Sequence, residues 1–203
     1  ISQIREDAYP FSLDTMETNE KIRAKLVGLS QTGGLEPITV DQIDESGTVK
    51  KTVKLFDFDN IDNNDFVVTN QFELQGFKTP IKPDIILFVN GIPLVIIECK
   101  SPFIAQWLEE AVEQKNFKKY RSTGNGYERL MFYNHILIAT NGDEARHGTI
   151  SSDVNQFQNS RWSSAYPLTI DDVEKVYGKS RGQEILIAGM LQKPHLLDLL
   201  KNY

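Results

Sequence analysis

Three charged side chains in one apolar stretch of this sequence have the chemistry of a hydrolytic site. The stretch PDIILFVNGIPLVIIECK (83–100) places Asp84 directly after a proline and ends in Glu98-Cys99-Lys100. Charges at the end of a buried strand are costly unless they are paired or hold a metal ion. Two neighbouring carboxylates also repel each other unless a cation lies between them. The stretch therefore predicts a site where Asp84 and Glu98 hold a metal ion beside Lys100.

The residue types in this stretch indicate which metal and which reaction to expect. Carboxylates are hard oxygen ligands, and they suit Mg²⁺ better than Zn²⁺, with Mn²⁺ as a substitute. A neighbouring lysine can orient the attacking water and stabilise the charge that develops on phosphorus. Together these groups favour metal-assisted hydrolysis of a phosphodiester.

A hairpin must bring the two acids together, because two apolar runs flank Asn90-Gly91, a dipeptide typical of tight hairpin turns. A plain two-residue turn would put Asp84 and Glu98 on opposite faces of the hairpin. They share a face only if the loop has an odd number of residues, if a bulge intervenes, or if pairing has lapsed at Pro83. We therefore expect an irregularity near the turn or near Pro83.

The rest of the chain predicts an α/β fold, in which a mixed central sheet is flanked by helices and followed by a helical C-terminal appendage. We assign residues 1–167 to one domain, with its core at about 49–165, and residues 168–203 to a helical connector. Periodicity predicts strands at 49–56, 66–74, 85–89, 94–99, 134–139 and near 147–151, and helices at 17–29, 104–120, 169–176 and 183–201, the last kinked or broken at Pro194.

The composition limits which partners and which compartment we expect for this protein. The net charge of −6 argues against a free-standing nucleic-acid binder, since phosphate contacts need Lys and Arg. The single cysteine suits a reducing compartment, and we expect a cytoplasmic protein. The apolar runs fall short of the ~18 residues of a membrane helix, so we expect no membrane partner. Because the chain opens on Ile1 and not on methionine, we expect a fragment of a longer protein.

The spacing of Pro-Asp and Glu-x-Lys resembles the signature of the PD-(D/E)xK nuclease superfamily. Three longer segments resemble the N-terminal nuclease region of the restriction subunit of type I restriction-modification enzymes: DFDNIDNNDFVVTNQFEL, KPDIILFVNGIPLVIIECKSP and FYNHILIATNGDEARHGTISS. The resemblance covers about residues 49–165, and VNGIPLVIIECKSP is its most specific part.

This resemblance implies a restriction-endonuclease-like core and a metal-dependent DNA endonuclease domain from a prokaryote. It implies that Asp84, Glu98 and Lys100 are catalytic, and that Asp84, Glu98 and the backbone carbonyl of Cys99 bind Mg²⁺. It also implies partners: double-stranded DNA, and the modification and specificity subunits. Residues 168–203 would connect to an ATP-driven translocase motor outside this chain, because no phosphate loop of the form G-x-x-x-x-G-K-[ST] is present.

The following helix departs from the family pattern, which usually has Gln-x-x-x-Tyr. Here Asn116 stands four residues before Tyr120, where glutamine is expected. This spacing keeps both side chains on one helix face, directed to the DNA or to the site, or simply half exposed. Gln71 is a further candidate for a DNA contact or for support of the site. Two alternatives stay open: another PD-(D/E)xK nuclease that acts in repair or junction cutting, and a silent nuclease-like scaffold for subunit docking.

Overall fold

The computed structural model describes residues 39–44, 47–52, 55–75, 78, 80–114, 117–122, 128–159 and 168–202. The chain forms two compact units, Ile1–Asp57 and Phe58–Tyr203. In the smaller unit, β1 (Thr39–Asp44) pairs antiparallel with β2 (Gly47–Thr52). The candidate catalytic residues all belong to the larger unit.

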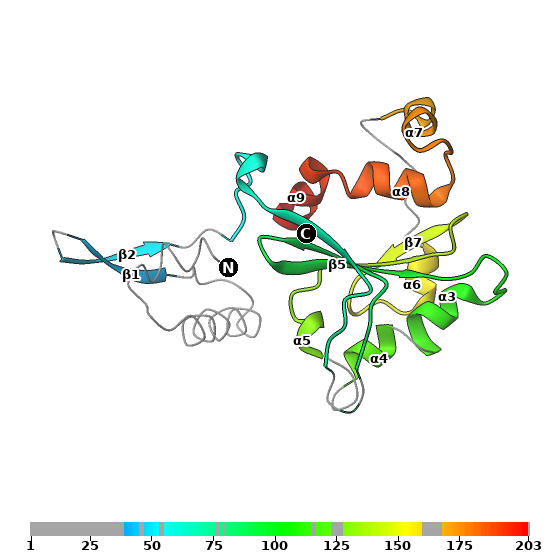
Figure 1. The fold of residues 1–203 in the computed structure, drawn as a ribbon, viewed down its shortest axis with the longest axis horizontal. Coiled ribbons are helices and arrows are strands. Elements are labelled where there is room, and N and C mark those ends of the chain that lie inside the picture. The colour runs from blue at the N-terminus through cyan, green and yellow to red at the C-terminus, as the bar shows by residue number, and fades with distance from the viewer. Residues whose placement is uncertain are drawn as a thin grey trace. The chain divides into compact units, whose positions relative to one another are not determined.

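The larger unit is built on a five-stranded sheet with the order β3-β4-β5-β6-β7 (Figure 1). All neighbouring strands run antiparallel except β5 and β6, which are parallel. A parallel pair needs a crossover, and the chain between β5 and β6 supplies it with helices. The sheet is therefore mixed, as predicted. Its strands are β3 (Phe66–Asn70), β4 (Ile85–Val89), β5 (Ile92–Cys99), β6 (Ile136–Thr140) and β7 (Ala145–Gly148).

One face of the sheet is covered by helices that form the main core. The crossover contains α3 (Trp107–Glu109), the π-helical turn η2 (Glu110–Gln114), α4 (Phe117–Arg121) and α5 (Glu128–Met131), and α6 (Val154–Asn159) follows β7. The core cluster joins sheet side chains to helix side chains: Ile86, Ile96, Leu137 and Ala139 with Leu108, Ala111, Val112, Phe117, Leu130, Met131 and Phe157.

Helices α8 (Gly182–Met190) and α9 (Lys193–Asn202) lie on the opposite side of the sheet, with α7 (Ile170–Tyr177) beyond them (Figure 1). Helix α7 begins with a capping box between Thr169 and Asp172, and it ends at Gly178 in the left-handed conformation. Helix α9 approaches β3, where the Lys193 ammonium lies 5.1 Å from the centre of the Phe66 ring. Helices α8 and α9 thus lie on the second face of the sheet, and α7 packs against α8.

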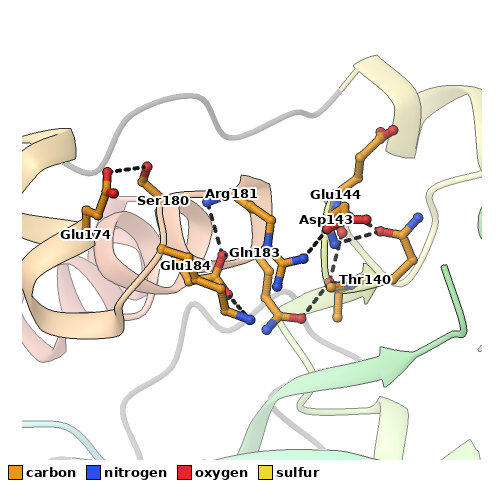
Figure 2. A network of polar contacts seen from close by, with 11 residues as sticks. Thr140, Asp143, Glu144, Glu174, Ser180, Arg181, Gln183 and Glu184 are labelled. Carbon is orange, nitrogen blue, oxygen red and sulfur yellow. Dashed lines mark hydrogen bonds and ion pairs between the residues drawn. The ribbon is translucent and has the colours of Figure 1, made fainter.

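A polar network joins α8 to the end of β6 and the turn that follows it (Figure 2). The Thr140 hydroxyl lies 2.8 Å from Glu144 O and 2.9 Å from Gln183 Oε1. The Gly182 N–H donates to Asp143 O at 2.9 Å. Nearby, the buried Glu184 carboxylate accepts from the Arg181 N–H at 3.1 Å and lies 3.2 Å from the Lys179 ammonium.

The predicted helix at 104–120 is wrong in its start and in its regularity. Residues 101–106 form turns, in which the Ile104 N–H donates to Ser101 O, and the helix begins only at Trp107. The bond to Ser101 O closes a turn at the position where the helix is predicted to start, whereas Pro102 restricts only the backbone of Ser101. The π-helical turn then interrupts the α-helical spacing, a feature that periodicity alone does not reveal.

Other predictions differ at their boundaries. Strand β3 ends at Asn70 and not at 74, because Gln71 adopts a positive φ of 52° that turns the chain. Helix α6 lies in a segment where no helix is predicted, and β7 begins at Ala145, before the predicted 147. The predicted 183–201 helix is broken before Pro194 into α8 and α9, as its sequence indicated. The predicted helix at 17–29 and the domain boundary at 167 lie outside the described residues.

Candidate active site

The hairpin of β4 and β5 contains the predicted irregularity. Asn90 and Gly91 form a two-residue turn with positive φ angles of 52° and 78°, which fits the type I′ turn favoured in hairpins. The register then shifts between Leu87 and Phe88, so that Leu94 is an extra residue on β5. The Leu94 carbonyl accepts a hydrogen bond from the backbone N–H of His135 at 2.8 Å, so the carbonyl of the extra residue keeps a hydrogen-bond partner.

The bulge sets which faces the acids occupy. Beyond it Ile85 pairs with Ile97, so the next residues in register, Asp84 and Glu98, stand opposite each other and point to one face of the sheet. A regular hairpin would have separated them. Of the three irregularities that could place both acids on one face, the structure contains the bulge.

Asp84 is held by donors from two neighbouring strands. Its Oδ2 accepts from the Cys99 backbone N–H at 2.8 Å, and its Oδ1 accepts from Gln71 Nε2 at 2.7 Å. The Gln71 N–H also donates to the backbone carbonyl of Asp84 at 2.8 Å. Gln71 therefore lies directly beside the candidate site, where it fixes the orientation of the Asp84 carboxylate.

Glu98 is fully buried, at 0% exposure. Asp84 raises the pKa of the Glu98 carboxyl group, whereas two other neighbours, Tyr120 and Lys100, lower it. The Tyr120 hydroxyl donates to Glu98 Oε1 at 2.8 Å, and Lys100 Nζ lies 3.7 Å from Oε2. The Lys100 side chain is only 11% exposed. The predicted trio of Asp84, Glu98 and Lys100 is thus brought together on one face of the hairpin.

The electrostatics of Glu98 reflect this crowding. Burial raises the pKa of Glu98 from its ordinary value of 4.5 to about 7, and the nearby Asp84 charge acts in the same direction. The Tyr120 hydrogen bond, the Lys100 ammonium and the backbone of Asp84 lower this pKa but do not offset the rise. A divalent cation next to a carboxyl group whose pKa is raised in this way would favour its ionised form.

The remaining candidates take different positions. Tyr120 is 3% exposed in the core beneath the site, so it orients Glu98 and does not face bulk solvent. The Cys99 side chain is exposed, and partial desolvation together with Asp84 raises the pKa of its thiol, which disfavours a reactive thiolate. Asn116 lies outside the described residues.

Sequence reasoning missed one residue that positions the site. The Lys100 N–H donates to Thr140 O at 2.7 Å, and Thr140 also joins the network of Figure 2. Thr140 ends the strand parallel to β5. Its place at the end of a predicted strand is the only sequence signal, and it does not reveal the contact.

The carboxylate pair fits Mg²⁺ by the chemistry of its donors. Across the described parts of the chain, no group of three or more His, Cys, Asp and Glu side chains is arranged to hold a metal ion. A Mg²⁺ ion needs fewer protein ligands than that, because it usually binds one or two carboxylates and keeps several waters. Asp84 and Glu98 would supply those carboxylates.

None of the helices in the described residues is long and apolar enough to cross a bilayer.

Fold and site together define a mixed α/β domain in which the buried Glu98, the partly exposed Asp84 and Lys100 lie together at the end of a bulged hairpin. A family model described as "Type I restriction enzyme R protein N terminus" matches residues 31–156. This span is more than half of the chain and contains the whole candidate site. The chain therefore belongs to the family of type I restriction enzyme R protein N-terminal domains.

Several curated proteins are similar to this chain. A putative type I restriction enzyme MjaIXP endonuclease subunit from Methanocaldococcus jannaschii is 34% identical over 172 residues, which cover 76% of this chain and 16% of that protein. The type I restriction enzyme HindI endonuclease subunit from Haemophilus influenzae is 33% identical over 154 residues, covering 74% and 14%. The EcoprrI endonuclease subunit from Escherichia coli is 28% identical, covering 80% and 48%. The chain thus spans about one sixth of the first two relatives.

Proposed function

We propose that this chain is the metal-dependent DNA endonuclease domain of a type I restriction enzyme, with a PD-(D/E)xK active site. The observation that carries the proposal is the bulge between Leu87 and Phe88. It turns Asp84 and Glu98 to the same face of the hairpin, beside Lys100. With a regular register after the two-residue turn, the two carboxylates would point to opposite faces of the hairpin.

Asp84, Glu98 and the backbone carbonyl of Cys99 would hold Mg²⁺, with Mn²⁺ as a substitute. When bound, the ion would neutralise charge on a phosphodiester and lower the pKa of a water molecule. The protein prepares this site in advance, because Gln71 and the Cys99 N–H orient Asp84 while Tyr120 orients Glu98. Such preorganisation is an advantage, since no reorientation is needed during the reaction.

Lys100 would act on the substrate directly. Its ammonium lies beside Glu98 Oε2, at the rim of the buried site. From there it can hold the attacking water and donate a hydrogen bond to a phosphate oxygen as negative charge develops. The bond from the Lys100 N–H to Thr140 O fixes its backbone, so only the side chain has to adjust.

We further propose that the domain acts inside a larger enzyme. An ATP-driven translocase outside this chain would deliver double-stranded DNA, and modification and specificity subunits would select the site. ATP would be needed only by the motor. The net charge of −6 supports this division of labour, because an acidic domain has little DNA affinity of its own.

The test separates cleavage from translocation in the complete enzyme. Lys100→Ala should translocate normally and lose DNA cleavage. The matched control is Lys175→Ala on α7, a lysine 77% exposed and on another element, which should keep both activities. If Lys100→Ala cleaved DNA as fast as the wild type, the catalytic assignment would be wrong. A wild-type enzyme that translocates without cleaving would favour the scaffold alternative.

A further inference from the structure

Immediately after the candidate active site, the chain exposes one aromatic side chain almost completely. Phe103 is 95% exposed, the most exposed large hydrophobic side chain among the described residues, and the next is Val176 at 67%. Leaving a phenylalanine in water forgoes the favourable free energy of burying its ring. Folding of this domain therefore gives no reason for its position.

The backbone holds Phe103 in a defined turn. The Phe103 N–H donates to Ser101 Oγ at 3.3 Å, and the Ile104 N–H donates to Ser101 O at 3.2 Å. Pro102 restricts the turn further, because its ring fixes φ. The turn directly follows Lys100, whose N–H is bonded to Thr140 O. The ring is thus presented from a short turn anchored at the proposed catalytic lysine.

Phe103 lies close to any substrate of this site, because few residues separate it from Lys100. Three peptide units separate it from Lys100, so their Cα atoms lie no more than about 11 Å apart. The grooves of duplex DNA are about 6 and 12 Å wide. A phosphate held at Lys100 would therefore bring the adjoining groove within reach of the Phe103 ring.

The surroundings favour nucleic acid over a protein partner. The segment 99–108 contains no Asp or Glu, although the chain as a whole is acidic. The other exposed large hydrophobic side chains among the described residues are less exposed than Phe103, and one of them, Phe72 at 39%, follows the site residue Gln71; they are at positions 58, 67, 68, 72, 132, 170, 176 and 177. A protein interface usually has a broad apolar centre, whereas a single protruding ring is what proteins insert against DNA bases.

We propose that Phe103 contacts the bases of the bound DNA in the groove beside the scissile phosphate, as a stacking or wedge residue. This inference rests on the proposed nuclease function. Base–aromatic stacking is strong enough that its loss typically weakens binding about 10-fold or more. Because Phe103 is exposed, its removal should leave the folded domain unchanged.

The experiment uses the complete enzyme with ATP and plasmid DNA. Phe103→Ala should cleave about 10-fold more slowly at limiting DNA, with unchanged translocation and unchanged thermal stability. Replacing Phe103 with photoreactive benzoylphenylalanine should give a covalent adduct with DNA on irradiation. The same replacement at Val176 is the control, and we expect it to give no DNA adduct.

The outcomes are distinguishable. An adduct to another protein chain at position 103, or cleavage by Phe103→Ala at the wild-type rate, would overturn this inference. If Lys100→Ala abolished cleavage in the same assay, the proposed function would still stand. If Lys100→Ala cleaved like the wild type, the proposed function would fail, and this inference would fail with it.

Discussion

Replacing Glu98 with glutamine should stabilise the metal-free domain at high pH. The pKa of Glu98 rises from 4.5 to about 7 on folding, through burial and the Asp84 charge. The folded state therefore binds the Glu98 proton more tightly than the unfolded state does. The stability from this group is complete below pH 4.5 and is lost as the pH rises through about 7. Glutamine keeps an acceptor for the Tyr120 hydroxyl without the charge.

The size of the effect follows from the pKa change. A change of this size corresponds to about 3 kcal/mol as an upper limit, since one pKa unit is worth ~1.36 kcal/mol. Relaxation of the site reduces this, so we expect the stability difference between Glu98→Gln and wild type to grow by about 1–3 kcal/mol from pH 5 to pH 8. Subtracting the wild type removes the contributions of His135 and His147, whose pKa values are lowered by burial.

Urea unfolding in EDTA at pH 5 and pH 8, followed by circular dichroism, measures this difference. The control is Glu73→Gln, at an exposed position, which should show no pH-dependent gain. A difference between Glu98→Gln and wild type that stays constant from pH 5 to pH 8 would refute the electrostatic reasoning about Glu98.

Two further predictions test the support of the site and the core. Tyr120→Phe removes the hydrogen bond that lowers the pKa of Glu98. The cleavage rate of the complete enzyme should therefore reach its plateau at a higher pH. An unchanged pH profile would count against this role of Tyr120. Gly148→Ala should cost about 1–3 kcal/mol in urea unfolding, because a Cβ there would lie 2.6 Å from the Phe157 ring, and wild-type stability would contradict that packing.

The hairpin could be predicted from the sequence because its signals are local. Asn90-Gly91 specifies the turn type through its positive φ angles, and the alternation of side chains along a strand converts the spacing of the acids into a statement about faces. For the two acids to share a face, the hairpin had to contain an irregularity, and the structure contains one. The sequence could not distinguish a bulge from a longer loop, since both restore the same parity.

Contacts between distant elements could not be predicted in the same way. The bond from Tyr120 to Glu98 joins residues 22 positions apart on a helix and a strand, and the periodicity within either element does not encode it. No helix is predicted at α6 because its sequence, VNQFQN, has only two apolar residues. Phe157 anchors it by stacking on Phe117 with ring centres 5.8 Å apart, and Val154 also packs against the core. Tertiary packing decided both features.

The most direct test of the central claim is calorimetric titration of the 203-residue chain with Mg²⁺ and Mn²⁺ at pH 8. We expect saturable binding to the wild type, weaker binding at pH 6 where Glu98 is protonated, and no comparable binding to Asp84→Asn. If the wild type bound neither ion, or if Asp84→Asn bound them equally well, Asp84 and Glu98 would not form a metal site.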